Sequence, residues 1–247
     1  MENPADYGIP SQEWGPCAIT ASGYVAAVER RQLACGLDPA NLVDFCGVAI
    51  VESIESPEVD AQGQPVLDIN QRQKLLPARY EVRSLRRLPR GVGYLAIVAE
   101  VGRLIAHPEM RGAVLCVDAG GLGGVVVDLI QAAGIAPNLI AVTTTGSVTG
   151  KETRSPDGTG LCVGKQQLVA NLQTLLQTGR LLIPRDLPES KTFLEELKSY
   201  SLTLSASGHP SYGASTGHDD LVSAASLAVF ALYPKKMGAW TTESLEL

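Results

Sequence analysis

Three long apolar stretches of this sequence carry acidic residues at one end. Asp38 and Asp118 each close a stretch with the character of a buried strand, and Asp219 and Asp220 open a stretch with the character of a buried helix. Burying a carboxylate costs free energy unless something compensates it, although a capping role explains any one of these acids taken alone. Together they predict carboxylates that converge on two divalent cations, Mg²⁺ or Mn²⁺, a chemistry that cleaves phosphodiester bonds.

The adjacent acids Asp219 and Asp220 are expected to have different roles. Successive side chains of a helix diverge by about 100°, so the two cannot point in one direction. We expect Asp220 to be the principal metal ligand, and Asp219 to cap the helix or to assist as a further ligand. His218, directly before them, is either a residue of the catalytic site or an ordinary polar residue beside a helix start.

The basic residues are few, but they are unevenly spread. The net charge is −6, whereas affinity for nucleic acid comes from Lys and Arg. Five arginines fall between residues 79 and 90. The alternation there predicts a strand with Arg79, Arg83 and Arg87 on one face, so that Arg83 and Arg87 would follow a DNA backbone. Protection of an exposed strand edge by charge explains the same pattern. Lys165, at an expected helix start, is either a further phosphate contact or a solvated lysine.

Hydrophobic periodicity predicts three strands followed by alternating helices and strands. The expected strands of the first part are 33–38, 46–52 and 80–88, with a loop at 53–74. The second part is expected to contain strands at 113–118, 138–144, 181–183 and 200–205, and helices at 94–107, 125–133, 165–178, 187–198 and 218–233. Residues 146–164 read as a polar loop. A three-stranded antiparallel meander that leads into parallel strands, with helices on both faces, is the ribonuclease H-like α/β pattern.

Length and composition fit one α/β domain with flanking segments. Of 247 residues, 45% are apolar and 19% are charged, which allows a sizeable core. We expect a lead-in at 1–31, the domain at 32–234 and a tail at 235–247. No apolar stretch reaches the ~18 residues that span a bilayer, and the N-terminus does not resemble a secretory signal. We therefore expect no membrane partner and a location in the cytoplasm.

Four segments resemble motifs of the nuclease domain of phage terminase large subunits. They are 36–39 followed by Asp44 and Phe45, then 116–123 with its Gly-rich turn, 164–181, and 217–224 with its His-Asp-Asp-Leu-Val sequence. Their order and spacing match that family from about residue 33 to residue 233. The chain departs from the family at Ser223, where another Asp is frequent, and at Ala40, where Gly is frequent.

The resemblance implies an endonuclease that cuts double-stranded DNA with two Mg²⁺ or Mn²⁺ ions, as in the cutting of concatemeric genomes during packaging. It also implies a separate packaging ATPase, a small terminase subunit and a portal as partners, because no stretch of this sequence reads as an ATPase half. Three alternatives are a resolvase-type nuclease of the same fold, a nucleotide-binding protein that uses the Gly-rich turn after Asp118, and a non-catalytic packaging-interaction module.

Overall fold

The computed structural model describes residues 28–39, 44–145, 153–154, 160–204, 210–214 and 218–233. Most of the expected lead-in and the whole of the expected tail lie outside these residues. The first strand starts at Arg30, inside the stretch assigned to the lead-in, because Arg30 and Arg31 continue the pairing with the second strand. Among the described residues, no helix is both long enough and apolar enough to cross a membrane.

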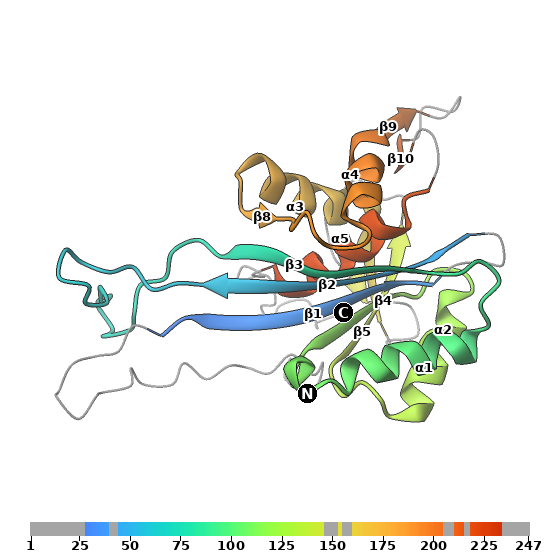
Figure 1. Ribbon diagram of the computed structural model, residues 1–247, viewed down its shortest axis with the longest axis horizontal. Coiled ribbons are helices and arrows are strands. Elements are labelled where there is room, and N and C mark those ends of the chain that lie inside the picture. The colour runs from blue at the N-terminus through green and yellow to red at the C-terminus, as the bar shows by residue number, and fades with distance from the viewer. Residues whose placement is uncertain are drawn as a thin grey trace, which may run out of the picture.

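A mixed sheet forms the centre of the described structure (Figure 1). Its strands in spatial order are β6 (Thr153–Arg154), β7 (Leu161–Gly164), β5 (Leu139–Thr145), β4 (Val114–Asp118), β1 (Arg30–Asp38), β2 (Cys46–Glu55), β3 (Arg79–Leu88) and β8 (Leu181–Leu182). β1, β2 and β3 form the predicted antiparallel meander. β4 pairs in parallel with β1, and β5 and β7 extend this parallel half. Parallel neighbours end at the same edge of a sheet, so the carboxyl ends of β1 and β4 meet.

Helices cover both faces of the sheet (Figure 1). One face packs against α1 (Tyr94–Ile105) and α2 (Gly123–Ala133), which η2 (Pro108–Met110) and β4 separate in sequence. The other face packs against α3 (Lys165–Gln177), α4 (Ser190–Ser199) and α5 (Asp220–Leu232). A two-stranded sheet, β9 (Tyr200–Leu204) with β10 (Pro210–Ala214), follows α4. This arrangement confirms the predicted ribonuclease H-like class and the meander that leads into parallel strands.

α5 lies directly on the sheet and is covered on its other sides by α3 and α4, which explains why its sequence is apolar all round. Two glycines of the sheet permit this approach. A Cβ atom on Gly36 of β1 would lie 1.9 Å from the Ala224 carbonyl oxygen, and one on Gly47 of β2 would lie 2.1 Å from the Asp220 carbonyl oxygen. Backbone atoms cannot give way as flexible side chains do, so these glycines fix the depth at which α5 sits and hold its first turn against β2.

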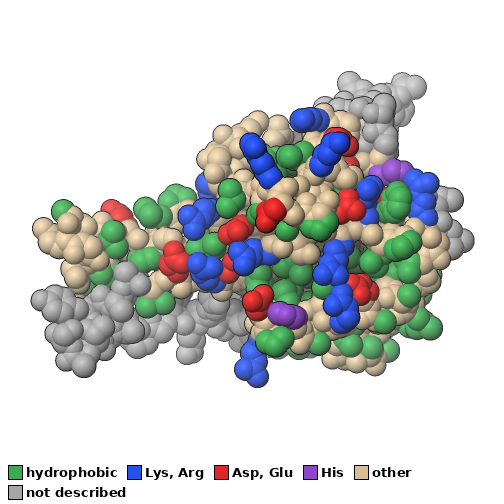
Figure 2. Space-filling model, in the orientation of Figure 1, with side chains coloured by type: hydrophobic (Ala, Val, Ile, Leu, Met, Phe, Trp, Pro, Cys, Tyr) green, Lys and Arg blue, Asp and Glu red, His purple; other side chains and the backbone are tan. Residues whose placement is uncertain are grey.

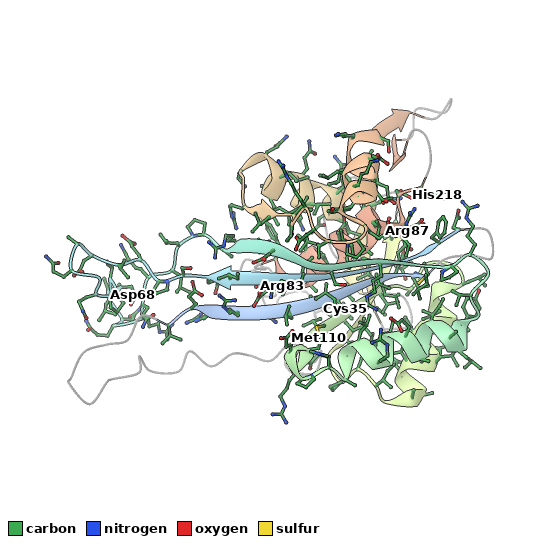
Figure 3. All side chains as sticks on the ribbon, viewed as in Figure 1. Cys35, Asp68, Arg83, Arg87, Met110 and His218 are labelled. Carbon is green, nitrogen blue, oxygen red and sulfur yellow. The ribbon has the colours of Figure 1, made fainter. Side chains whose placement is uncertain are left out.

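Two expected loops contain regular pairing. Within 146–164, Leu161–Gly164 forms β7 and pairs with β5, because its buried Leu161 and Val163 join the core. The stretch 53–74 is an arm: β2 continues to Glu55, and bridges such as Pro57 to Leu75 pair the chain beyond it. Figure 3 places Asp68 at the far end of this arm. The bridged residues include apolar ones two apart, Pro57 and Val59 on one side and Pro65 and Leu67 on the other, but the prolines and polar residues among them mask the strand pattern.

Candidate active site

A cavity of about 180 Å³ lies where the carboxyl ends of β1 and β4 meet α5. Asp38, Asp118 and Asp219 line it, and we call these three residues the acidic pocket. The remaining polar residues of the wall are Thr144, Lys165, Tyr200, Ser223 and Ser226. Since one water occupies about 30 Å³ of liquid, the cavity has room for cations together with part of their hydration.

The fold explains why residues so far apart in sequence meet in the acidic pocket. Asp38 ends β1, Asp118 ends the adjacent parallel strand β4, and Asp219 is the residue before α5, which packs against both strands. Asp38 and Asp118 therefore stand on the same rim of the sheet, and the helix start brings Asp219 over them. The structure thus brings together three of the four acids that the sequence singled out.

Asp38 is buried in the acidic pocket among other negative charges. Burial raises the pKa of this carboxyl well above its usual range, and the charges of Asp118, Asp220 and Asp219 raise it further, while Lys165 acts in the opposite direction. Lys165 reaches into the cavity from the start of α3, where its Nζ lies 3.1 Å from Asp219 Oδ2. Lys165 is therefore part of the pocket wall, and its side chain is still 37% exposed.

Asp118 is fixed by hydrogen bonds to both of its carboxylate oxygens. The Gly120 N–H donates to Oδ1 at 2.8 Å, and the Thr144 hydroxyl donates to Oδ2 at 3.3 Å. The Gly-rich turn after β4 therefore folds back onto Asp118. Gly123 packs so closely that a Cβ would lie 2.0 Å from the Asp118 carbonyl oxygen. A turn used in this way orients a carboxylate, which is a different task from cradling a pyrophosphate.

Asp219 lines the cavity and Asp220 does not, although the charge of Asp220 raises the pKa of Asp38 more than the charge of Asp219 does. Asp219, Ser223 and Ser226 all line the cavity, and their spacing puts them on one side of α5 at about 100° per residue. Asp220 is 7% exposed, and burial raises its pKa to about 6. Ser223 and Ser226 are the polar positions of an otherwise apolar helix beyond its first residue, and this stripe is the sequence signal that identifies the cavity-facing side.

The side chain that caps α5 comes from another helix. Asp219 occupies the N-cap position but makes no capping hydrogen bond, because its carboxylate binds Lys165. Glu196 of α4 accepts hydrogen bonds from the backbone N–H groups of Leu221 and Val222, at 2.9 and 3.2 Å. The expectation that Asp219 caps the helix is therefore wrong. The sequence showed no signal for Glu196, since a contact between two helices leaves no local pattern.

Arg83 and Arg87 do not share a face of β3, contrary to the prediction. The register of β2 and β3 shifts between Ile50 and Val51, whose partners are Ser84 and Val82, so Arg83 is an extra residue. A bulge of this kind reverses the alternation beyond it. Arg83 lies against Glu52 and Glu81, and Arg87 instead contacts Glu189 at 3.3 Å.

His218 stands next to the acidic pocket without lining it. Its Nδ1 is 3.3 Å from Asp44 Oδ1 and 4.0 Å from Asp220 Oδ2. Its Nε2 is 2.6 Å from an Arg90 guanidinium nitrogen, which can only donate. Nε2 therefore accepts, and the ring hydrogen lies on Nδ1, facing the two acids. Figure 3 shows His218 and Arg87 at the same end of the sheet.

The acidic pocket suits a hard divalent cation in its chemistry. Carboxylate oxygens are the ligands that Mg²⁺ and Mn²⁺ prefer, and cations would offset the mutual repulsion that raises the pKa of Asp38. Within the described ranges, no group of three acidic, histidine or cysteine side chains already forms a metal-binding arrangement. The three acids of the pocket fit a divalent cation by residue type and by location. Binding of the cation would require their side chains to adjust.

Comparison with known proteins identifies the family. The sequence pattern described as "Terminase RNaseH-like domain" matches residues 95–232, more than half of the chain and a stretch that contains Asp118 and Asp219. The chain belongs to the terminase RNase H-like domain family. The family predicted from the motifs around Asp38, Asp118 and Asp219 is thereby confirmed.

Two curated relatives and two solved structures extend this finding. The large terminase subunits of Thermus phage G20c and Thermus virus P23-45 are each 30% identical over 143 residues, 56% of this chain and 24% of theirs. The chain thus spans about a quarter of the length of these relatives. Crystal structures of the large terminase nuclease from phage G20c with bound cobalt and with bound magnesium both have a TM-score of 0.53. Their sequence identities are 23% and 22%, and each match covers 87% of this chain and 90% of theirs. This terminase domain therefore shares their fold.

Proposed function

We propose that this terminase domain is a metal-dependent endonuclease that cuts double-stranded DNA in genome packaging. The observation that carries the proposal is the acidic pocket, in which Asp38, Asp118 and Asp219 line one cavity together with Lys165. Family membership supports it, as do the cobalt and magnesium in the solved structures of the phage G20c nuclease.

Asp38, Asp118 and Asp219 would hold two Mg²⁺ or Mn²⁺ ions, with Asp220 supporting them from beside the pocket. Two such ions supply the positive charge that activates water and stabilises the leaving 3′ oxygen of a phosphodiester. Gly120 and Thr144 keep the Asp118 carboxylate in place. Lys165 neutralises Asp219 and offers a cation on the cavity wall for a backbone phosphate.

The partners in packaging belong to the same proposal. The curated relatives are about four times as long as the stretch that this chain matches. We propose that the ATPase that drives DNA translocation, together with a small terminase subunit and a portal, acts with this domain during packaging.

Plasmid cleavage with Mn²⁺, in the presence and absence of a chelator, tests the proposal. Wild type should nick and linearise the plasmid only when Mn²⁺ is free, and Asp38→Asn and Asp118→Asn should abolish cleavage. Asp128→Asn is the matched control, because Asp128 is an exposed acid of α2 outside the cavity. Cleavage that survives both pocket substitutions, or a wild type inactive at every Mn²⁺ concentration, would overturn the proposal.

A further inference from the structure

A second cluster of charged and aromatic side chains lies on the same rim of the sheet as the acidic pocket. The guanidinium carbons of Arg87 and Arg90 lie over the Phe45 ring, 4.7 and 4.6 Å from its centroid. The His218 ring meets Phe45 edge-on at 5.5 Å between centroids. We call Phe45, Arg87 and Arg90 the arginine platform. Figure 2 shows basic and hydrophobic side chains gathered beside a histidine at this end of the molecule.

The register of the sheet sets the distance between the arginine platform and the acidic pocket. Asp38 pairs with Gly47 in β1 and β2, and Gly47 pairs with Arg87 in β2 and β3. The three residues therefore form one row across adjacent strands, which lie about 4.8 Å apart, so Arg87 stands roughly 10 Å from Asp38.

The two arginines of the platform have different surroundings. Arg87 is only 22% exposed in its side chain and is paired with Glu189. Arg90 is exposed, and its described contacts are the Phe45 ring and the His218 acceptor nitrogen. Among the described acids, none lies within ion-pair distance of Arg90. The Arg90 guanidinium is therefore held in place by neutral groups, and its positive charge is available to bind an anion from solution.

A tight turn presents Arg90 at the end of β3. The Val92 N–H donates to the Pro89 carbonyl oxygen at 3.3 Å, and Gly91 has φ of +73°. A positive φ at the third position is typical of a type II turn, which places Arg90 at the second position, on the outside of the bend. The turn, the Phe45 ring and His218 thus hold the guanidinium on the rim, next to the residue that precedes Asp219.

We propose that Arg90 binds a backbone phosphate of the nucleic acid whose scissile bond lies in the acidic pocket. The ligand chemistry is a phosphodiester, read without regard to base sequence, and its identity as DNA rests on the proposed nuclease function. Arg87 packs against the Phe45 ring and does not contact the phosphate. The subsite would fix how far along the strand the substrate extends from the cleaved bond.

Duplex binding in metal-free buffer with a chelator tests the subsite separately from cleavage. The affinity of a fluorescent duplex is measured by anisotropy over a salt series for wild type, Arg90→Gln and Arg90→Lys. Gln removes the charge but retains an N–H donor for His218, and Lys retains the charge. One lost phosphate contact should make the slope of log K against log salt shallower by about 0.9, which weakens binding by about eightfold at 0.1 M salt. Arg90→Lys should keep most of the slope.

Arg111→Ala serves as the matched control. Arg111 is also exposed, and it lies just before β4 begins, at the rim opposite Asp118, so its loss should leave the slope unchanged. The thermal midpoint and the calorimetric Mn²⁺ affinity of Arg90→Gln should equal those of wild type. An unchanged salt slope in Arg90→Gln, or a wild type that does not bind the duplex, overturns the subsite. If the slope changes but Mn²⁺ supports no cleavage, the subsite stands and the nuclease proposal fails.

Discussion

Glu196 holds the start of α5 at an electrostatic cost that depends on pH. Glu196 is 5% exposed, and its carboxylate accepts the two N–H hydrogen bonds from Leu221 and Val222. Burial raises the pKa of Glu196 from 4.5 to about 7, although these hydrogen bonds act in the opposite direction. The native protein therefore binds a proton that the unfolded chain releases at about pH 4.5. The stability that this proton contributes is present at low pH and is lost as pH rises through about 7.

Glu196→Gln should remove this loss while keeping an oxygen acceptor for the helix. A pKa raised from 4.5 to about 7 corresponds to about 3 kcal/mol in total, most of it between pH 5 and pH 8. The variant should therefore exceed wild type in free energy of unfolding by about 2 kcal/mol more at pH 8 than at pH 5. Glu196→Ala, in contrast, leaves two buried N–H groups without acceptors, each at a cost of about 1–3 kcal/mol.

Urea unfolding at pH 5 and pH 8, with a chelator present, measures these differences. Glu195→Gln on the same helix is the control, because its side chain is 63% exposed, and it should leave the pH dependence unchanged. The start of α5 positions Asp219, so Glu196→Ala should also weaken Mn²⁺ binding. We expect a loss of about tenfold, which is typical when a partner that orients a metal ligand is removed. Glu196→Gln should leave Mn²⁺ binding unchanged. A Glu196→Gln variant that gains no stability between pH 5 and pH 8 refutes the argument.

Two further pairs of substitutions test the acid pair and the helix–sheet contact. Asp219→Asn should eliminate cleavage and weaken Mn²⁺ binding, measured by calorimetry, by more than the roughly tenfold expected for an outer partner. Asp220→Asn should leave measurable cleavage and equal or higher stability, since burial raises the pKa of Asp220; the opposite ranking would restore Asp220 as principal ligand. Gly36→Ala should destabilise by about 3 kcal/mol in urea unfolding, because the new methyl group meets the Ala224 carbonyl oxygen. Gly124→Ala on α2 would place its methyl group at an ordinary contact distance, 3.7 Å from the Ala119 carbonyl oxygen, and should stabilise by about 0.5–1 kcal/mol. Equal effects of the two changes would contradict the packing.

The sequence by itself determined the fold class and the general location of the chemistry. Two apolar runs end in Asp38 and Asp118, and an apolar helix starts after Asp219. These features follow from burial and from hydrophobic periods of 2 residues in strands and 3.6 residues in helices, which are local properties of the chain. The meander and the parallel strands followed from the same patterns, and the family motifs gave the adjacency of β1 and β4.

The tertiary structure alone decided which groups face one another. Asp219 lines the acidic pocket because α5 is oriented so that Ser223 and Ser226 share its side, and the contacts of Gly36 and Gly47 with the helix backbone set the depth of α5 on the sheet. The cap from Glu196, the reversal of alternation at Arg83 and the placement of Arg90 depend equally on contacts between distant segments. Such contacts depend on pairing register and on packing depth, which no single stretch of sequence encodes.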